Sequence, residues 1–351
     1  MLADYLDDYA RGYEPYKGGR WCYEDGCLYR ALELWYVETG EARWLDHIHR
    51  LADPQIGKDG GLKGYELSDY NIDNILSGRT LMYLHGLTGE AHYLKAADLL
   101  ARQLATQPRT KSGVYWHKLR YPWQIWLDGL YMGQPFQIAH AQAHGNADAV
   151  ADSLAQLGTA LDTLFDPASG LYWHAYDEAR EQPWSDPVTG FNKAFWARAI
   201  GWLAMALVDV ADLVGAEFDP LRDRTTALLE KIITLRTAGG LWLQVIDQPD
   251  LDGNYEESSA SAMFSYALLR GARLGLVAAP DDLADVLIQK TIKPKPGGGH
   301  EMVEICEVAG LGWYENRFRD GSAAYYLTEA RVADDIKGVA PLLMAAAIMP
   351  R

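Results

Sequence analysis

The chain has 351 residues and a net charge of −16, which argues against nucleic acid or an anionic membrane surface as a partner. Apolar residues make up 49% of the chain, enough for a large core, but no apolar run approaches the roughly 20 residues of a membrane span. The three cysteines, Cys22, Cys27 and Cys306, lack regular spacing, so we expect reduced thiols. The acidic start lacks the features of a signal peptide, and we expect a cytoplasmic protein.

Apolar residues recur at helical spacing in six pairs of segments along the chain. The first members lie near 21–39, 71–88, 128–144, 193–214, 257–275 and 321–330, and the second members near 41–53, 90–107, 146–165, 217–236, 281–292 and 336–349. Gly and then an acidic residue separate the members of the early pairs, as in ETGEARWL (Glu38–Leu45) and its repeat LTGEAHYL (Leu87–Leu94). These residues are typical of a helix end followed by a helix start.

Six helical hairpins predict an all-α fold, an (α/α)6 barrel that occupies residues 1–351 as one domain. The first members are more apolar and are expected to form the inner ring, with the amphipathic second members outside. An open α-solenoid is the alternative. The segments GGLKGYEL, SGVYWHKL, SGLYWHAY and GGLWLQVI, which lie between pairs, alternate apolar and aromatic residues and predict short strands or hairpins in the loops at the mouth.

Inner helices that run in parallel would bring six N-termini to one mouth of the barrel, where their dipoles favour an anionic ligand. The chain also has 12 Trp and 21 Tyr against 7 Phe. Tyr and Trp suit polar rings such as sugars, because they join flat apolar faces to hydrogen-bonding groups. They can equally fill the gaps between helices.

Two carboxylates stand at expected inner-helix starts, Asp73 in YNIDNIL and Asp128 in WQIWLDGLYMGQPF. Either could be an N-cap, which Asp forms well. Two such acids in aromatic surroundings at one mouth instead favour acid–base chemistry. Burial among aromatic side chains raises the pKa of Asp128, whereas a helix N-terminus and nearby cations lower it, and the sequence leaves the sum open.

Basic groups interleaved with aromatic residues form a second set of candidates: His117, Lys118, His174 and Arg198. Each could be structural, but together they could hold a carboxylate at the mouth. Trp196 and Trp202 either pack on sugar rings or fill the core. No metal site is expected, because His47 and His49 face apart on a helix and Cys22 and Cys27 lack a second cysteine pair.

The segments WLDGLYMGQPF, FWARAIGWLAMALVDV, ESSASAMFSYALLRGARLG and RDGSAAYYLTE resemble the unsaturated rhamnogalacturonyl hydrolases of glycoside hydrolase family 105, relatives of the unsaturated glucuronyl hydrolases. The resemblance runs from about Trp21 to the C-terminus. It implies an (α/α)6 barrel without a cofactor, with Asp128 as general acid and base and Asp73 as the second functional acid. It also implies substrate contacts from Tyr23, His117, Lys118, Met132, His174, Trp196, Arg198 and Trp202. The chain departs from the family pattern at Gly133, where Ala is expected, and a wider pocket is the expected consequence.

The chemistry that the resemblance implies is the release of a terminal 4,5-unsaturated uronic acid from a small oligosaccharide. A protonated Asp128 would add its proton to C4 of the enol ether and then act as base while water adds at C5. The glycosidic bond of the resulting hemiketal then breaks. One acid would serve both steps, unlike ordinary glycosidases, which use two.

Two alternatives remain open in the sequence. One is an inverting glycosidase that acts on saturated sugars, with Asp73 and Asp128 as its acid and base. The other is a sugar-binding toroid without catalysis, since one fold hosts many functions. The sequence does not indicate galacturonyl or glucuronyl preference, the neighbouring sugar or the oligomeric state.

Overall fold

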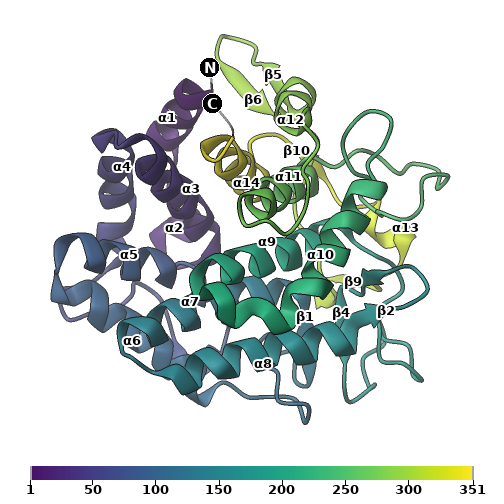
Figure 1. Cartoon of the computed structure of the whole chain (residues 1–351), viewed down its shortest axis with the longest axis horizontal. Helices are drawn as coiled ribbons and strands as arrows, with labels where there is room; N and C mark the ends of the chain where they lie inside the picture. Colours follow the sequence, from purple (N-terminus) through teal and green to yellow (C-terminus); the bar gives the residue numbers. More distant parts are fainter. Residues whose placement is uncertain (1, 350–351) are drawn as a thin grey trace.

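In the computed structural model, which describes residues 2–349, six helices form a closed inner ring. They are α3 (Tyr23–Thr39), α5 (Gly78–Thr88), α7 (Leu127–Ala143), α9 (Ala197–Val214), α11 (Ser258–Arg273) and α14 (Ile336–Ala347). Each contacts the next, and α14 contacts α3, so that the two ends of the chain close the ring (Figure 1). The predicted all-α, (α/α)6 barrel is confirmed.

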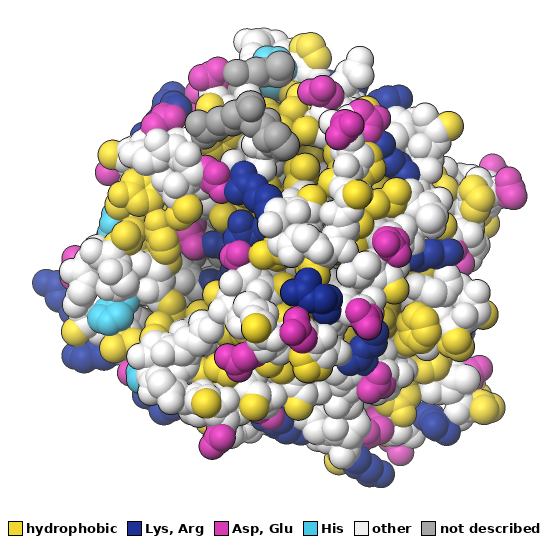
Figure 2. Space-filling view, in the orientation of Figure 1, with side chains coloured by type: hydrophobic (Ala, Val, Ile, Leu, Met, Phe, Trp, Pro, Cys, Tyr) yellow, Lys and Arg dark blue, Asp and Glu magenta, His cyan; other side chains and the backbone are white. Residues whose placement is uncertain are grey.

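An outer helix packs against each inner one. The outer helices are α4 (Ala42–Ala52), α6 (Ala91–Thr106), α8 (Ala147–Leu164), α10 (Asp219–Thr234), α12 (Leu283–Thr291) and α1 (Leu2–Gly12). The short helices are α2 (Tyr16–Gly19), α13 (Ala323–Tyr326) and the 3-10 turns η1 (Asp53–Gln55), η2 (Leu67–Asp69), η3 (Ile72–Ile75) and η4 (Gly215–Phe218). Acidic and basic side chains are interspersed over the face seen in Figure 2.

The sixth predicted hairpin is wrong. Residues 321–330 contain only the short α13, and the segment predicted as its outer partner is the inner helix α14. The outer partner of α14 is α1, from the other end of the chain. The physical reason lies in α14 itself, which is buried on all sides as an apolar inner helix is expected to be.

The strands form two-stranded antiparallel pairs near the loops. The pairs are β1 (Gln124–Trp126) with β4 (Ala175–Asp177), β2 (Phe165–Asp166) with β3 (Leu171–Tyr172), β5 (Ile292–Pro294) with β6 (His300–Met302), β7 (Ile305–Cys306) with β10 (Arg331–Val332), and β8 (Gly312–Tyr314) with β9 (Arg317–Arg319). Of the four predicted strand segments, SGLYWHAY contains β3 and part of β4, whereas the other three form isolated bridges.

One helical stretch corrects the expectation that no apolar run reaches membrane length. From Ala197 to Thr234, α9 continues through η4 into α10, and by length and composition this stretch could cross a membrane. However, 78% of its apolar window is buried inside the protein. The position of α9 between α7 and α11 in the inner ring accounts for the apolar composition of the first part of the stretch.

A charged cluster lies inside the ring. Asp209 of α9 accepts hydrogen bonds from Arg79 of α5 and from the Tyr266 hydroxyl of α11, both at 2.6 Å. Burial raises the pKa of Asp209, but the positive charges of Arg79 and Arg30 outweigh this effect and the pKa falls below its usual value. Both carboxylate oxygens are bonded, so the cluster ties three inner helices together.

Candidate active site

A cavity of about 840 Å³ opens where the inner helices begin. Its wall includes Tyr23 from the first turn of α3, Asp128 and Met132 from α7, and Lys337 from the first turn of α14. Loop segments complete the wall, among them residues 68–73, 117–121 and 307–309. Of the six inner-helix starts predicted to gather at one mouth, those of α3, α7 and α14 line this cavity.

Two glycines of α7 bring the Asp73 turn close to Asp128. A Cβ atom at Gly133 would lie 2.8 Å from Cδ1 of Ile72, and one at Gly129 would lie 3.1 Å from Nδ1 of His117. Both distances are shorter than ordinary packing contacts, so a side chain at either position would require Ile72 or His117 to shift. A Cβ atom at Gly133 would face Ile72, and Gly133 does not line the cavity, so the expectation that Gly133 widens the pocket stays a prediction.

Asp73 is a paired carboxylate. It lies inside η3, where the side chain of Asn71 caps its backbone N–H at 3.2 Å, so Asp73 is not the N-cap. Nζ of Lys118 lies 2.5 Å from its Oδ2, and Nε2 of His117 lies 3.6 Å from its Oδ1. Burial raises the pKa of Asp73. Lys118 and His117 lower it by more than burial raises it, so the net pKa is below the usual value.

Asp128, unlike Asp73, has no Lys or Arg partner among the described residues. It is the second residue of α7, whose N-cap position is Trp126. Its Oδ2 lies 3.3 Å from Nε2 of His174 and is buried without a hydrogen bond. Burial raises the pKa of Asp128, but His174 and His117 outweigh it, so the net pKa is lowered. This resolves the balance that the sequence left open, and neither acid is a helix N-cap.

His174 is held in place by three elements. It is fully buried, and its backbone oxygen accepts a hydrogen bond from Leu127 at 3.0 Å, next to the β1–β4 pair. Its Nδ1 lies 2.7 Å from the hydroxyl of Tyr326. A neutral His174 that accepts this hydroxyl proton presents its Nε2–H to Asp128.

A stack of three parallel rings forms the other side of the acid pair. His117 and Tyr121 each stack on Trp126, with centroid distances of 4.6 and 4.9 Å, and their own centroids lie 6.2 Å apart. Burial in this stack lowers the pKa of His117 to about 4. His117 is therefore neutral near neutral pH, and Lys118 supplies the positive charge beside Asp73.

Most of the predicted site residues lie together, and two lie behind the wall. Tyr23, Asp73, His117, Lys118, Asp128, Met132 and Trp202 line the cavity, and His174 lies against Asp128. Arg198 is 1% exposed, and its guanidinium donates to Ser259 and to the backbone oxygens of Cys306 and Glu307. Trp196 is also buried and stacks on Tyr326. Neither residue lines the cavity, so neither geometry supports direct substrate contact.

Arg319 is a cavity residue that the sequence analysis missed. It is 6% exposed, and its Nε has no hydrogen-bond partner. Among the described residues it pairs with no carboxylate, and its guanidinium lies 4.8 Å from the Tyr314 ring. The sequence contained one indication, because Arg319 is the first residue of the segment RDGSAAYYLTE.

The sequence analysis also missed a cluster outside this cavity. Asp98 of α6 lies beside His140 and His144 of α7, with ligand atoms within 4.8 Å of one another. The spacing of the two histidines, four residues apart on one helix, could have indicated it.

Known proteins of one group are similar to this chain in sequence and in structure. The model of Glycosyl Hydrolase Family 88 matches residues 6–351. A family 105 glycoside hydrolase structure from C. acetobutylicum has a TM-score of 0.92 and 36% identity, and the match covers 99% of this chain and 97% of that one. Protein Atu3128 of Agrobacterium fabrum is 47% identical over 61% of this chain and 96% of its own length. The unsaturated rhamnogalacturonyl hydrolase YesR of Bacillus subtilis is 28% identical over 76% of this chain and 75% of its own.

These similarities extend over the barrel and the elements that form the mouth. The family 88 model includes the segments that carry Asp73, Asp128 and His174, and the family 105 structure is matched along nearly its full length. The chain therefore belongs to the glycoside hydrolases of families 88 and 105, and its 36% identity over almost the whole chain places it in family 105.

Proposed function

We propose that the protein removes the terminal 4,5-unsaturated uronic acid from short oligosaccharides by adding water to the double bond. The observation that carries the proposal is the difference between the partners of the two acids. Each has one buried oxygen without a hydrogen bond, but Asp73 is paired with the ammonium of Lys118 at 2.5 Å, whereas Asp128 faces only the imidazole of His174 at 3.3 Å. Only Asp128 is free to exchange a proton with a bound sugar.

The chemistry needs one carboxyl group. Asp128 adds its proton to C4 of the enol ether, and positive charge develops at C5 and the ring oxygen. The carboxylate of Asp128 then takes a proton from water as its oxygen bonds to C5. The product is a hemiketal, which opens to a keto sugar and releases the next sugar as an alcohol.

An inverting glycosidase would require a protonated acid and a separate base. Asp73 is unsuited to either role, because its ion pair with Lys118 stabilises the carboxylate and reduces its basicity. Hydration by Asp128 alone avoids this difficulty. Asp73 is then a positioning residue that holds Lys118 and His117 beside the sugar.

Asp128 must gain a proton before the first step, although its pKa is lowered in the free protein. A uronic acid brings a negative charge into the cavity and displaces water, and both effects raise the pKa of a neighbouring carboxyl group. We therefore expect the high-pH limb of kcat to lie at higher pH than that of kcat/KM, since kcat reports the bound complex.

The finer assignment is the unsaturated galacturonyl group of rhamnogalacturonan lyase products. Its support is the name of the Bacillus relative and the membership in family 105. Unsaturated glucuronyl substrates are the second candidate. A panel of matched unsaturated galacturonyl and glucuronyl disaccharides, followed by loss of ultraviolet absorbance, would rank the two.

Turnover in heavy water tests the proposed reaction. Asp128 would deliver a solvent-derived proton, so deuterium should be found at C4 of the released keto sugar, initially on one face of the ring. Absorbance of the double bond should fall in step with this incorporation, and saturated uronides of the same length should stay intact. Release of an unsaturated sugar without deuterium at C4 would exclude hydration and favour the two-carboxylate mechanism.

A further inference from the structure

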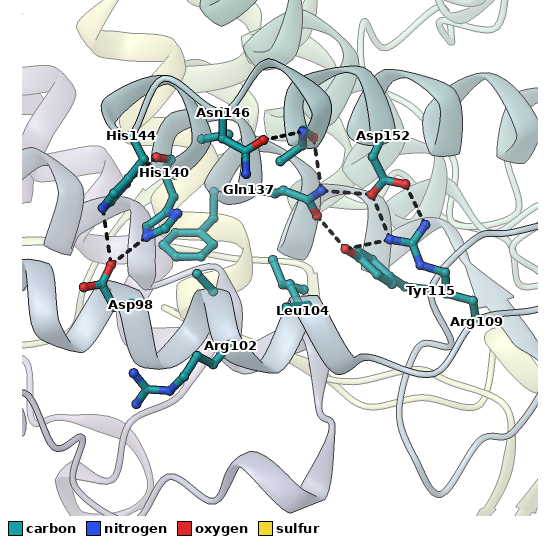
Figure 3. A pocket seen from close by; sticks show the side chains of 15 residues that line it. Asp98, Arg102, Leu104, Arg109, Tyr115, Gln137, His140, His144, Asn146 and Asp152 are labelled. Carbon is teal, nitrogen blue, oxygen red and sulfur yellow. Dashed lines mark hydrogen bonds and ion pairs between the residues drawn. The ribbon is translucent and has the colours of Figure 1, made fainter.

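A second cluster of chemically active side chains lies where α6 passes the C-terminal end of α7 (Figure 3). Nε2 of His140 lies 2.8 Å from Oδ1 of Asp98, and Nε2 of His144 lies 3.6 Å from the same oxygen. The two imidazole rings stack with their centroids 4.2 Å apart. Three potential ligand atoms therefore converge from two helices.

The surroundings prepare these groups for a cation. Nδ1 of His144 donates to the backbone oxygen of His140 at 2.9 Å, which orients the ring with Nε2 toward Asp98. The C-terminal end of α7, where both histidines lie, has the negative end of the helix dipole. Among the described residues, the ion-pair partners of Asp98 are these two imidazoles and no Lys or Arg.

We propose that Asp98, His140 and His144 bind one divalent transition-metal ion, with zinc as the ion whose ligand preference fits best. Zinc takes imidazole nitrogen and carboxylate oxygen at about 2.0–2.2 Å, which places tetrahedral ligands about 3.3 Å apart. The distances of 2.8 and 3.6 Å lie on either side of this value, so small side-chain movements complete the site.

The fourth coordination position is open. The three residues line one end of a cavity of about 530 Å³, whose other end contains Arg109 and Asp152 (Figure 3). Three protein ligands beside open space are the pattern of an exchangeable zinc site, in which water occupies the remaining position. The ion would join the outer helix of the second hairpin to the inner helix of the third.

This site is separate from the proposed reaction. Asp128 lies in the first turn of α7, whereas His140 and His144 lie at its other end. We therefore expect the ion to stabilise the fold and to leave turnover unchanged. Failure of the metal site would not affect the proposed hydrolase function, and the reverse also holds.

Equilibrium dialysis against zinc, with metal analysis, tests the proposal on the full-length protein. Wild type should retain one equivalent, and Asp98→Asn and His144→Ala should each reduce affinity at least tenfold. His85→Ala is the matched control, because His85 occupies the last turn of another inner helix and should leave zinc binding intact. Zinc at about 100 times the Kd should raise the Tm of wild type by about 4 °C but not that of the two site variants.

Cobalt provides a measurement that does not depend on stability. Bound Co²⁺ with two imidazoles and a carboxylate should give visible absorption bands of a four- or five-coordinate ion, and these should be absent in His144→Ala. The proposal is overturned if wild type retains no zinc, or if both site variants bind zinc as wild type does. In that case the cluster is an imidazole–carboxylate ion pair that contributes only to packing.

Discussion

The mouth and the interior of the barrel both contain buried carboxylates, but the hydrogen bonds and ion pairs of these groups differ between the two regions. In the interior, both oxygens of Asp209 are bonded, to Arg79 and to Tyr266. At the mouth, Asp73 and Asp128 each keep one buried oxygen without a hydrogen bond, and the nearest basic group to that oxygen of Asp128 is Nε2 of His174 at 3.3 Å. An unsatisfied buried group costs free energy, so natural proteins keep few of them. The comparison indicates that the interior carboxylate serves stability and that the mouth carboxylate serves a bound sugar.

The largest effect on turnover is expected from Asp128→Asn. The amide cannot donate and recover a proton, so kcat should fall by about 10³-fold or more. The variant should still fold, but its free energy of unfolding should be smaller than that of wild type, because the surroundings of Asp128 stabilise the charge that the substitution removes. Kinetics and urea unfolding of the same preparation provide the measurement. A variant that keeps turnover within tenfold of wild type would remove Asp128 from the mechanism.

Asp209→Asn should give the opposite result. It leaves the Arg79 charge buried without its anionic partner, which typically destabilises a protein by about 3–5 kcal/mol. At temperatures well below its Tm, the variant should keep the kcat of wild type. Tyr266→Phe is the milder control and should cost about 1 kcal/mol, as expected for one hydrogen bond. If the folded Asp209→Asn variant lost kcat, the interior carboxylate would also contribute to turnover, and the assignment of Asp209 to stability alone would be wrong.

The buried His117 at the mouth should make the stability of the protein depend on pH. The pKa of His117 falls from 6.5 to about 4 in the folded state, so between these values the unfolded chain binds more protons. The free energy of unfolding should therefore decrease as pH falls from about 6.5 to about 4, by roughly 3 kcal/mol. His117→Asn should remove most of this slope. If the variant kept the same dependence of the free energy of unfolding on pH, groups other than His117 would be its cause.

The smallest expected effect distinguishes two arginines. Arg319 lines the cavity without a carboxylate partner, so Arg319→Met should weaken binding of a uronyl substrate by about 1.5–3 kcal/mol. A carboxyl-reduced substrate should lose much less. Arg198→Met should reduce stability instead, because the guanidinium holds the backbone of Cys306 and Glu307. If Arg319→Met weakened binding of both substrates equally, a group other than Arg319 would bind the substrate carboxylate.

The sequence predicted five of the six hairpins because their helices are long, periodic and separated by Gly. It assigned Ile336–Ala347 to the outer ring because the segment was paired with its neighbour in the chain. Its true partner, α1, lies at the opposite end of the sequence. Local periodicity contains no information about such a pairing, although the apolar character of Ile336–Ala347 on all sides indicates an inner position.

The candidate site was predictable where chemistry follows from residue type, as for Asp73, Asp128 and Lys118. It was not predictable where a distant segment decides the role of a side chain. The aromatic setting of Arg198 suggested a substrate contact, but backbone oxygens more than a hundred residues later bind its guanidinium. Likewise, the pKa of Asp128 depends on His174, whose position is set by the β1–β4 pair.

The closure of the ring by α14 against α3 has a consequence for synthesis of the protein. Until α14 has been made, the side of α3 that it covers has no partner, so the ring closes only after this helix forms. Contacts between the two ends of a long chain form slowly because a large loop must close first. The helices α1 and α14 are in contact, so a short linker could join them. A circular permutant made in this way, with new ends in an outer loop, should form the same barrel with a different helix closing the ring.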